Sequence, residues 1–288
     1  MASLWMIAAS FCFALMGTFI KMSSAKLAMA DIVFYRTLIN FLIVALLMRL
    51  RGTGARTAYL GLHIRRGLIG SLALALGFYS ITNLPLGTAV TLNYTTPIFL
   101  AILSAVLFRQ RPSAALCLAV LIGFLGILVL LQPTLAPEQY LPALIGLACG
   151  LVTALAYYNV GVLVRAGEPE TRVVFYFSLI GTLISLVWLA CRGFSALDRT
   201  TALLVLGFSL SGTVGQLAMT RAYGRGPALI TGAFSYSTIV FSSLFGLLFF
   251  NERLEWLGWA GIALVIVSGG LAMASRLKNA PAPAPARS

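Results

Sequence analysis

Residues 85–111 read PLGTAVTLNYTTPIFLAILSAVLFRQR, and residues 227–253, which lie 142 positions further along the chain, read PALITGAFSYSTIVFSSLFGLLFFNER. Each stretch begins at a proline, runs through polar residues into a long apolar helix, and ends in a polar or charged triplet. The six identities in these 27 positions are Pro85 with Pro227, Tyr94 with Tyr236, Thr96 with Thr238, Phe99 with Phe241, Phe108 with Phe250 and Arg111 with Arg253. A match at one fixed spacing favours duplication of a larger unit, although shared apolar composition is the alternative explanation.

The rest of the chain is as apolar as these two stretches. Hydrophobic residues make up 60% of the 288 positions, the mean hydropathy is +0.98, and only 9% of the residues are charged. Soluble domains carry roughly 25% charged residues. The composition therefore excludes a water-soluble globule and predicts many membrane-spanning helices, each of about 20 mostly apolar residues.

The unbroken apolar runs predict an all-α membrane protein with ten transmembrane helices, arranged as two inverted five-helix repeats. The expected helices are Leu4–Ile20, Ile32–Met48, Leu68–Ile81, Thr88–Phe108, Ala114–Leu131, Leu141–Val164, Val173–Ala190, Ala202–Thr220, Ala228–Phe250 and Trp256–Ala274. Because five is an odd number, the second repeat starts on the opposite side of the membrane, and such inversion is typical of alternating-access transporters. The expected boundaries are 1–135 and 136–275 for the repeats and 276–288 for a disordered cytoplasmic tail.

The charges indicate how the chain is oriented. The 20 basic residues outnumber seven acidic residues and give a net charge of +13. If the N-terminus is cytoplasmic, fourteen basic residues fall on the inner side, including Arg65 and Arg66 beside His63 in a loop, and five fall on the outer side. This distribution satisfies the positive-inside rule, so both termini are expected in the cytoplasm of a multi-pass protein of the bacterial inner membrane. Nucleic acid is not needed to explain the positive charge.

Polar and aromatic residues within the expected helices indicate a binding site. In the eighth helix Ser209, Thr213, Gln216 and Thr220 recur at helical spacing and share one face. Aromatic rings combined with hydroxyl and amide groups suit a moderately apolar, net-neutral solute. The candidate substrate-binding residues are Tyr79, Asn93, Tyr94, Thr95, Tyr157, Asn159, Thr213, Gln216, Ser235 and Tyr236.

The alternative for each of these residues is ordinary helix packing, because single Ser and Thr side chains in membrane helices usually bond to the backbone or to a neighbouring helix. The amides of Asn93, Asn159 and Gln216 are expected to face other helices or a wet cavity, since their own helix cannot satisfy them. Tyr94 and Tyr236 are favoured as binding residues because both repeats carry them.

Arg36 and Pro97 are singled out for other reasons. Arg36 is the one charge expected inside a helix, where it extends outward to the membrane surface, pairs with Asp31, or attracts the carboxylate of a substrate. Pro97 is expected to bend the fourth helix and to serve in gating. Its equivalent in the second repeat is Ile239, so such a bend would make the two halves unequal.

Residues missing from the expected helices narrow the function further. No Asp, Glu or His is expected deep in a helix, which favours facilitated or exchange transport over tight proton coupling and argues against a hydrolase. An organic anion as substrate would need more buried Lys or Arg than Arg36 alone. The four cysteines are scattered and there is no P-loop string, so neither a metal site nor any cofactor is predicted.

Together these features resemble the drug/metabolite transporter superfamily, and within it the EamA type. The resemblance rests on ten helices in two groups of five, helix starts at Pro85 and Pro227, Arg36 in the second helix, the triplets 109–111 and 251–253, and glycine-rich fifth and tenth helices. It covers the chain to about Ala274 and is most similar to the bacterial YddG-type exporters of aromatic amino acids.

The resemblance implies a transporter and not an enzyme. The expected function is the export of neutral amino acids, aromatic or hydrophobic, by alternating access through a central cavity. Expected partners are the small-molecule substrate and membrane lipids, without nucleic acid, and a monomer is favoured over a dimer. Two alternatives stay open: an exporter of another small metabolite or drug, and a polytopic membrane enzyme.

Overall fold

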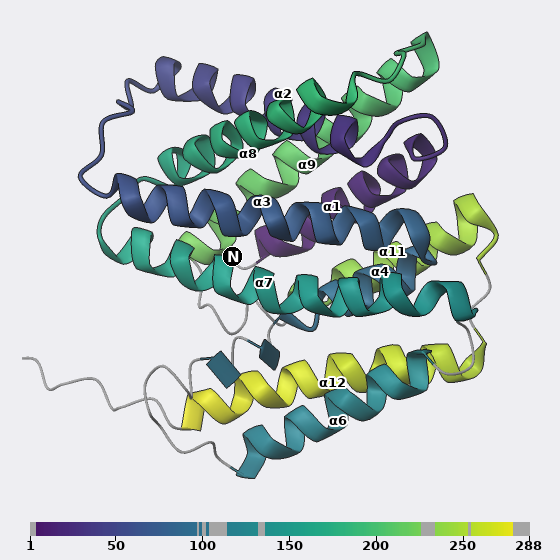
Figure 1. The fold of residues 1–288 in the computed structure, drawn as a ribbon. Coiled ribbons are helices and arrows are strands. Elements are labelled where there is room, and N and C mark those ends of the chain that lie inside the picture. The colour runs from purple at the N-terminus through teal and green to yellow at the C-terminus, as the bar shows by residue number, and fades with distance from the viewer. Residues whose placement is uncertain are drawn as a thin grey trace, which may run out of the picture.

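The computed structural model describes residues 4–96, 98–99, 102–103, 114–131, 136–225, 234–252 and 255–278, and these residues form a bundle of α-helices without strands (Figure 1). The helices are α1 (Trp5–Ser23), α2 (Met29–Leu50), α3 (Leu60–Asn83), α4 (Leu86–Asn93), α6 (Ala114–Leu131), α7 (Tyr140–Arg165), α8 (Glu170–Arg192), α9 (Arg199–Arg225), α11 (Ser237–Phe250) and α12 (Trp256–Lys278), with a 3-10 turn, η2 (Pro137–Gln139), before α7. The all-α prediction is confirmed over the described residues.

Several of these helices are suited to a bilayer. The segments long and apolar enough to cross a membrane are Trp5–Ser23, Met29–Leu50, Leu60–Asn83, Pro137–Val164, Glu170–Arg192 and Arg199–Ala222, and Ser237–Phe250 and Trp256–Ser268 are shorter apolar helices. A helix satisfies its own backbone hydrogen bonds, which is why continuous apolar runs in a membrane fold this way. The protein is therefore built as a multi-pass membrane protein.

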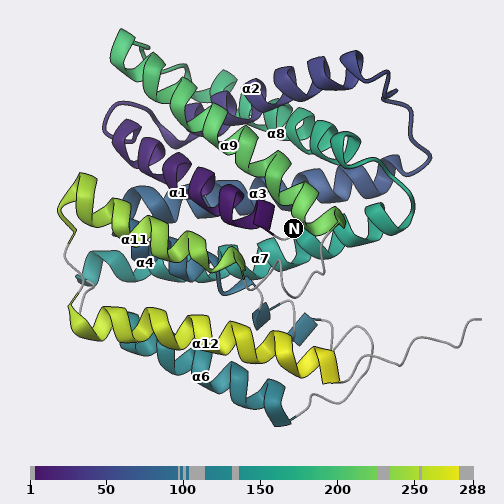
Figure 2. The same ribbon diagram turned by 180° about the vertical axis from the view of Figure 1, so that it is seen from behind.

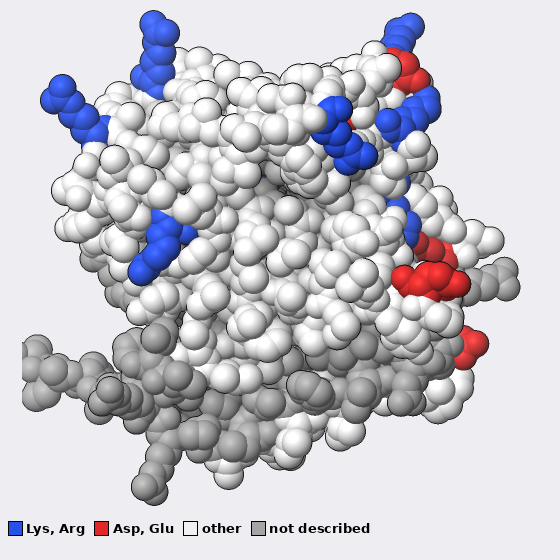
Figure 3. All heavy atoms as spheres, viewed as in Figure 1, with Lys and Arg blue, Asp and Glu red and all other residues white. Residues whose placement is uncertain are grey.

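The bundle has two ends, named here after the predicted orientation. The inner end holds the α2–α3 and α7–α8 connections, and the outer end holds the α1–α2 and α8–α9 connections. On the face in Figure 3, charged side chains lie towards these two ends, and acidic side chains are visible only towards the outer end. Apart from one basic group above and to the right of the centre, the middle of that face is uncharged wherever it is drawn as described residues. This distribution agrees with a membrane around the middle of the bundle.

The helices pack as antiparallel pairs that each take one helix from either half of the chain (Figures 1 and 2). The pairs are α1 with α9, α2 with α8, α3 with α7, α4 with α11 and α6 with α12. Their direction follows from individual contacts. At one end of the α2–α8 pair Asp31 accepts hydrogen bonds from Ser195, and further along Val44 packs with Val174.

This set of pairs is unchanged when the two halves are exchanged. If every helix is replaced by its equivalent in the other half, α1–α9 becomes α7–α3, while α2–α8, α4–α11 and α6–α12 become themselves. The further contacts α3–α8 and α1–α11 likewise become α9–α2 and α7–α4, which are both present. The packing thus follows the two-fold pattern that an inverted repeat requires.

Glycine lets α6 and α12 lie very close together. A Cβ atom at Gly126 would lie 2.9 Å from the Leu264 Cβ and 3.0 Å from the Gly261 carbonyl oxygen. Small residues permit this approach between membrane helices. The glycines of the fifth helix therefore serve packing within the chain, and Figures 1 and 2 show the α6–α12 pair as a layer beside the remaining helices.

Helix α3 begins earlier than the hydropathy pattern predicted. It starts at Leu60 and not at Leu68, so His63, Arg65 and Arg66 are helical and not part of a loop. A hydropathy pattern ends a predicted helix at charged residues. The helix itself can continue through them when their side chains are buried against partners or reach the end of the bundle. Arg36 is therefore not the only charge within a helix.

The expected fourth and ninth helices are each interrupted. Helix α4 ends at Asn93 and is followed by a turn at Tyr94 and Thr95, and α11 begins at Ser237 after a turn at Tyr236. These two interruptions occur at equivalent positions of the repeat, so in this respect the two halves are alike. Pro97, predicted to cause a bend, lies outside the described residues. At the far end of the chain, residues 276–278 belong to α12 and not to the predicted tail, while 279–288 lie outside the described residues.

Candidate functional site

The two helix interruptions meet between the halves of the molecule. The Thr238 hydroxyl donates a hydrogen bond of 2.9 Å to the Tyr94 hydroxyl, which joins α11 to the end of α4. Tyr94 and Tyr236 belong to the same apolar cluster, and Tyr236 is only 4% exposed. The structure thus brings together the two tyrosines that the repeat predicted as a pair.

The interruption after α4 also packs against α7. The Thr96 hydroxyl lies 2.8 Å from the Asn93 carbonyl oxygen and 3.1 Å from that of Gly150. A Cβ atom at Gly150 would collide with the Thr95 Oγ1, so glycine is needed for this approach. The amide oxygen of Asn93 is buried without a hydrogen-bond partner among the described residues, as predicted for a side chain facing other helices.

The remaining candidates differ in whether described contacts connect them to the helix interruptions. The Tyr157 hydroxyl donates to the Met219 Sδ at 3.4 Å, and both lie in a cluster that includes Phe234, next to the buried Ser235. Tyr157 and Ser235 therefore connect to the α11 interruption. Tyr79 lies half-buried near the outer end of α3 and is not joined to this group by a described contact.

Three further polar candidates differ in their surroundings. The Asn159 Nδ2 donates to the Leu155 carbonyl oxygen of its own helix at 2.8 Å, so the expectation that its helix could not satisfy the amide was wrong for this donor. The Thr213 hydroxyl likewise donates to the Ser209 carbonyl oxygen at 2.8 Å. Gln216 is half-buried on the same helix. The Thr213 hydroxyl, part of the predicted polar face, thus bonds to its own helix α9.

Arg36 is buried and held by neighbouring helices. It is 2% exposed, its Nη2 donates to the Gly212 carbonyl oxygen at 2.8 Å, and its Nε lies 3.3 Å from the Met16 Sδ. The predicted pairing with Asp31 is wrong, because that carboxylate accepts hydrogen bonds from Ser195 instead. A Cβ atom at Gly212 would collide with the Arg36 Nε, so the guanidinium fills the space that the glycine leaves.

Arg66 is a second buried guanidinium, which sequence reasoning placed in a loop. It is 5% exposed and lies with its Cζ 4.5 Å from the centre of the Phe177 ring. Its Nε and Nη1 have no hydrogen-bond partner among the described residues. A Cβ atom at Gly70, one turn later, would collide with the guanidinium. The spacing of Arg66 and Gly70 is the one sequence signal that could have suggested a side chain lying along α3.

Buried polar side-chain atoms without a protein partner occur throughout the described part of the chain. They belong to Asn40, His63, Arg66, Ser71, Ser80, Thr88, Asn93, Asn159, Thr201, Tyr236, Ser242 and Ser243. They come from both halves. Leaving such an atom unbonded costs roughly 1–3 kcal/mol, so hydrogen bonds from water or from a solute are needed to offset the burial. Asn93 and Tyr236 lie at the two helix interruptions, and the others are spread over several helices.

An ion pair joins the halves at the outer end. The Lys21 ammonium lies 2.5 Å from the Glu252 carboxylate, donates to the Leu84 carbonyl oxygen and sits 5.2 Å from the centre of the Phe250 ring. The other oxygen of Glu252 accepts from the Leu86 amide at 2.8 Å. We call Lys21, Glu252, Leu84 and Leu86 the outer latch.

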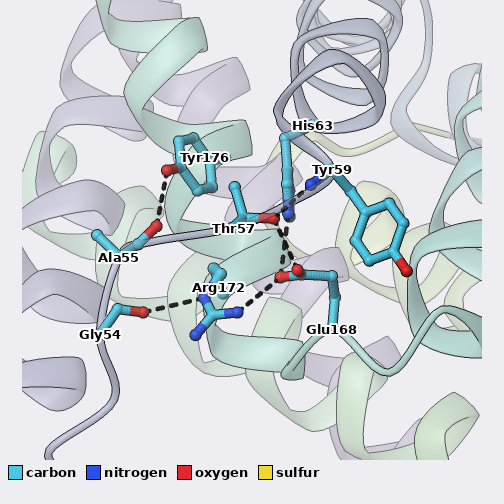
Figure 4. Close-up of polar contacts among 8 residues, drawn as sticks. All are labelled: Gly54, Ala55, Thr57, Tyr59, His63, Glu168, Arg172 and Tyr176. Carbon is cyan, nitrogen blue, oxygen red and sulfur yellow. Dashed lines mark hydrogen bonds and ion pairs between the residues drawn. The ribbon is translucent and has the colours of Figure 1, made fainter.

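A second network joins the halves at the inner end (Figure 4). Glu168, which follows α7, accepts hydrogen bonds from Thr57 at 2.7 Å, from Arg172 at 3.0 Å and from His63 Nε2 at 3.2 Å. An ionised carboxylate only accepts, so His63 Nε2 carries a proton in this contact. We call Thr57, His63, Glu168 and Arg172 the inner cluster.

Glu168 is ionised in this environment and ties the loops together. Burial raises the pKa of the Glu168 carboxyl, but hydrogen bonds from Thr57, Arg172 and His63 outweigh it and hold the pKa below its usual value. Arg172 also donates to the Gly54 carbonyl oxygen, and the Tyr176 hydroxyl donates to that of Ala55 (Figure 4). The α2–α3 loop is therefore fastened to α8 at several points.

Comparison with known proteins decides the family. The EamA-like transporter family matches residues 1–132 and again residues 141–274, which together span nearly the whole chain. The chain belongs to the EamA-like transporter family. The predicted membership is confirmed, and a transporter is what the family and its named relatives share.

Individual relatives of this EamA-like transporter are similar over most of their length. The pseudopaline exporter of Pseudomonas aeruginosa is 32% identical over 264 residues, 91% of this chain and 92% of that protein. A riboflavin transporter of Vibrio cholerae is 25% identical over 275 residues, 92% of this chain and 90% of that protein. A crystal structure at 20% identity aligns over 97% of this chain and 99% of its own with a TM-score of 0.69, which shows a shared fold.

These relatives support a small-metabolite transporter in general and not the narrower resemblance to YddG-type exporters of aromatic amino acids. Within the described residues, no group of three or more His, Cys, Asp or Glu side chains could hold a metal ion. The chemistry available between the halves is hydrogen bonding, ring contact and the charge of two buried guanidinium groups.

Proposed function

We propose that this EamA-like protein is a secondary transporter that exports small organic solutes, neutral amino acids with aromatic or hydrophobic side chains among them, by alternating access between its two halves. The observation that carries the proposal is the meeting of two helix interruptions at equivalent positions of the repeat, Tyr94 and Tyr236. Interrupted helices at the interface of inverted halves are typical substrate sites in transporters.

The inverted repeat is part of the same proposal, with boundaries near 1–135 and 136–275. The exchange symmetry of the helix pairs supports it. An even total of helices would put both termini on one side of the membrane, and the arginine-rich end supports the cytoplasmic side of a bacterial inner membrane as the proposed one. A single copy of the chain contains both halves and is sufficient for such a path.

The two end networks provide the gates. The outer latch and the inner cluster each tie an element of the first half to an element of the second, and both are formed in this structure. A path between the halves opens at one end only when the contacts at that end break. Breaking one network while keeping the other would expose the interior to one compartment at a time.

The driving force is the solute gradient or exchange and not tight proton coupling. All seven acidic residues lie in the described part of the chain, and the two that are buried, Asp31 and Glu168, are engaged at the bundle ends by Ser195 and by the inner cluster. Proton-driven carriers commonly use a titratable group within the membrane. This arrangement leaves no carboxylate beside the helix interruptions.

The substrate-binding residues proposed for the path are those that the structure connects to the interruptions, Asn93, Tyr94, Thr95, Ser235 and Tyr236, with Tyr157 nearby. Pro97 retains its proposed gating role, whereas the carboxylate contact expected of Arg36 is not kept, because the Gly212 carbonyl oxygen and the Met16 sulfur occupy two of its donors. Relatives named for pseudopaline and riboflavin make another small metabolite the second candidate substrate.

Counterflow in proteoliposomes tests the proposal. Vesicles preloaded with an unlabelled amino acid should accumulate the same amino acid in labelled form, and phenylalanine and leucine are the first solutes to try. Vesicles holding Tyr94→Ala or Tyr236→Ala protein should accumulate much less, although the variants insert and purify normally. Absence of counterflow with every amino acid, in a preparation that elutes as one folded species, would remove the amino acid proposal and leave the metabolite alternative.

A further inference from the structure

We propose that Arg66 binds the carboxylate of the transported solute. The inference rests on the proposed function and adds to it a substrate class, organic carboxylates, together with the residue that selects it. The sequence pattern assigned Arg66 to the charge of an inner loop, and nothing in its immediate sequence distinguishes it from its neighbour Arg65.

The first step is that the charge of Arg66 has no counterpart in the protein. The side chain is 5% exposed, and none of the seven acidic residues, all of which are described, forms an ion pair with it. Its Nε and Nη1 also lack hydrogen-bond partners among the described residues. A buried charge without an opposite charge or hydrogen bonds is strongly unfavourable, so an anion from outside the chain would be stabilising there.

The second step is the contrast with Arg36. Arg36 is just as deeply buried, but the Gly212 carbonyl oxygen and the Met16 sulfur occupy two of its donors. Arg36 therefore fastens α2 to α1 and α9. The Nε and Nη1 of Arg66 make no hydrogen bond to the described residues, and the Phe177 ring lies against one side of its guanidinium. A ring against the face of a guanidinium leaves the N–H groups at its edge directed elsewhere.

The third step is the position of Arg66. It lies one turn beyond His63 on α3, and hence directly behind the inner cluster on the way into the bundle. Tyr157, which connects to the α11 interruption through the Met219 and Phe234 cluster, lies close enough to interact electrostatically with it. A solute entering from the inner end would meet Arg66 first and the tyrosines of the interruptions afterwards.

The fourth step is the chemistry of the ligand. Guanidinium binds carboxylate through charge-assisted hydrogen bonds, and the rings of Phe177 and Tyr157 nearby suit an apolar part of the same molecule. One positive charge matches one carboxylate. A phosphate monoester would bring close to two negative charges to a site with a single described guanidinium, so the carboxylate is the better match.

The test measures binding by thermal unfolding of the full chain purified in detergent. Benzoate and L-phenylalanine are the carboxylate probes, benzamide and L-phenylalaninamide carry the same rings without the carboxylate, and inorganic phosphate is the third arm. Wild-type protein should bind each carboxylate about tenfold or more tightly than its amide, as expected for a hydrogen bond to a charged group. Phosphate should give a weaker response than benzoate.

The decisive variants are Arg66→Gln and Arg65→Gln. Both remove one positive charge from adjacent residues, but Arg65 is exposed and Arg66 is buried. R66Q should lose the preference for carboxylates while unfolding, without probe, at no lower temperature than wild type, since it removes an unpaired buried charge. R65Q should behave as wild type. Arg66→Lys keeps the charge and should retain part of the preference.

The outcomes separate this inference from the proposed function. Equal binding of carboxylate and amide by wild type, an unchanged preference in R66Q, or a phosphate response stronger than benzoate would each overturn the carboxylate site. Failure of both R66Q and R66K to fold would show Arg66 to be structural and would also overturn it. If R66Q loses the preference while wild type shows no amino acid counterflow, the carboxylate site stands and the amino acid proposal fails.

Discussion

The two ends of this transporter are closed by different chemistry. At the outer end Lys21 and Glu252 form an ion pair in which each side chain is about one-sixth exposed, at 17% and 16%. At the inner end a single carboxylate, Glu168, is shared by three donors and is 5% exposed. The outer latch pairs opposite charges from the two halves, whereas the inner cluster joins the halves through hydrogen bonds from Thr57 and His63 to a carboxylate whose ion-pair partner, Arg172, lies in the same half.

The repeat explains why the ends must differ. Under the shift of 142 residues, Lys21 corresponds to Leu163 and Glu252 corresponds to Gln110, so the sequence cannot form an ion pair at the equivalent inner position. Each half therefore contributes charges that the other half lacks. Two halves with the same helix packing can still give the inward-open and outward-open states different free energies, because opening breaks an ion pair at one end and a hydrogen-bonded carboxylate at the other.

The largest effect is expected from breaking the outer latch. Glu252→Gln leaves the partly buried Lys21 ammonium without its counter-charge, which at roughly 1–3 kcal/mol should shift the opening equilibrium by about fivefold or more. Opening can be followed with Ser243→Cys in a cysteine-free background, because Ser243 is 3% exposed where α11 meets Gly87 of α4. The rate at which a water-soluble maleimide labels the introduced thiol should rise about tenfold.

Glu255→Gln is the matched control for the outer latch. It removes the same charge three residues further on, from an exposed side chain without a described partner, and should leave the labelling rate unchanged. Equal labelling in E252Q and E255Q would show that the ion pair does not hold the outer end closed.

Breaking the inner cluster should have a smaller and pH-dependent effect. The pKa of Glu168 lies below its usual value of 4.5, so its stabilising contribution is complete at neutral pH and is lost as the pH falls through that lowered pKa. Glu168→Gln should lower the unfolding temperature by a few degrees at pH 7, which corresponds to roughly 1–2 kcal/mol. The difference from wild type should shrink as the pH is lowered towards 4 and below.

Glu170→Gln, two residues away and outside the cluster, serves as the control because it has none of the described Glu168 contacts. A gap between wild type and E168Q that widens on acidification would contradict the assignment of the lowered pKa to Glu168.

The differences between the ends were only partly accessible from the sequence. Apolar runs predicted the helices, and the fixed spacing of the repeat singled out Tyr94 and Tyr236 as equivalent residues, since both follow from periodicity. The outer latch joins residues 231 positions apart, and the contact depends on Asn251, whose φ of 51° turns the chain back after α11. No pattern in one sequence without a structure indicates such a partner.

Burial of charge was the least predictable property. Hydropathy started the third helix after Arg66, at Leu68, because it averages charge over a window and cannot tell a side chain that leaves the bundle from one that turns inward. Arg65 and Arg66 are identical in type, and only the helix phase separates the exposed one from the buried one. The amide of Asn159 was misjudged for a related reason, since bonding to its own helix at Leu155 is a matter of rotamer.

A third effect, smaller again, concerns the interruptions between the two ends. Tyr94→Phe removes the acceptor of the Thr238 hydroxyl and should cost roughly 1 kcal/mol, or about fivefold in transport. Tyr236→Phe removes a buried hydroxyl that has no partner within the described protein, so it should leave stability unchanged or raise it while lowering transport. The measurement is counterflow alongside unfolding temperature. If both variants lose stability, both hydroxyls serve helix packing and not substrate binding.

The smallest effect is expected on α9, where the polar face predicted for binding is split by the structure. The hydrogen of the Thr213 hydroxyl is taken by the Ser209 carbonyl oxygen of the same helix, so Thr213→Val should change transport less than about twofold and leave the order of solute preference intact. Gln216→Leu, one turn towards the inner end, removes a half-buried amide whose side chain the helix does not engage through a described bond, and should reorder those preferences. Competition between pairs of unlabelled amino acids during counterflow measures both. If Thr213→Val reorders the preferences and Gln216→Leu does not, the solute contacts α9 closer to the outer latch than to the inner cluster, and the comparison of the two ends must be redrawn around that position.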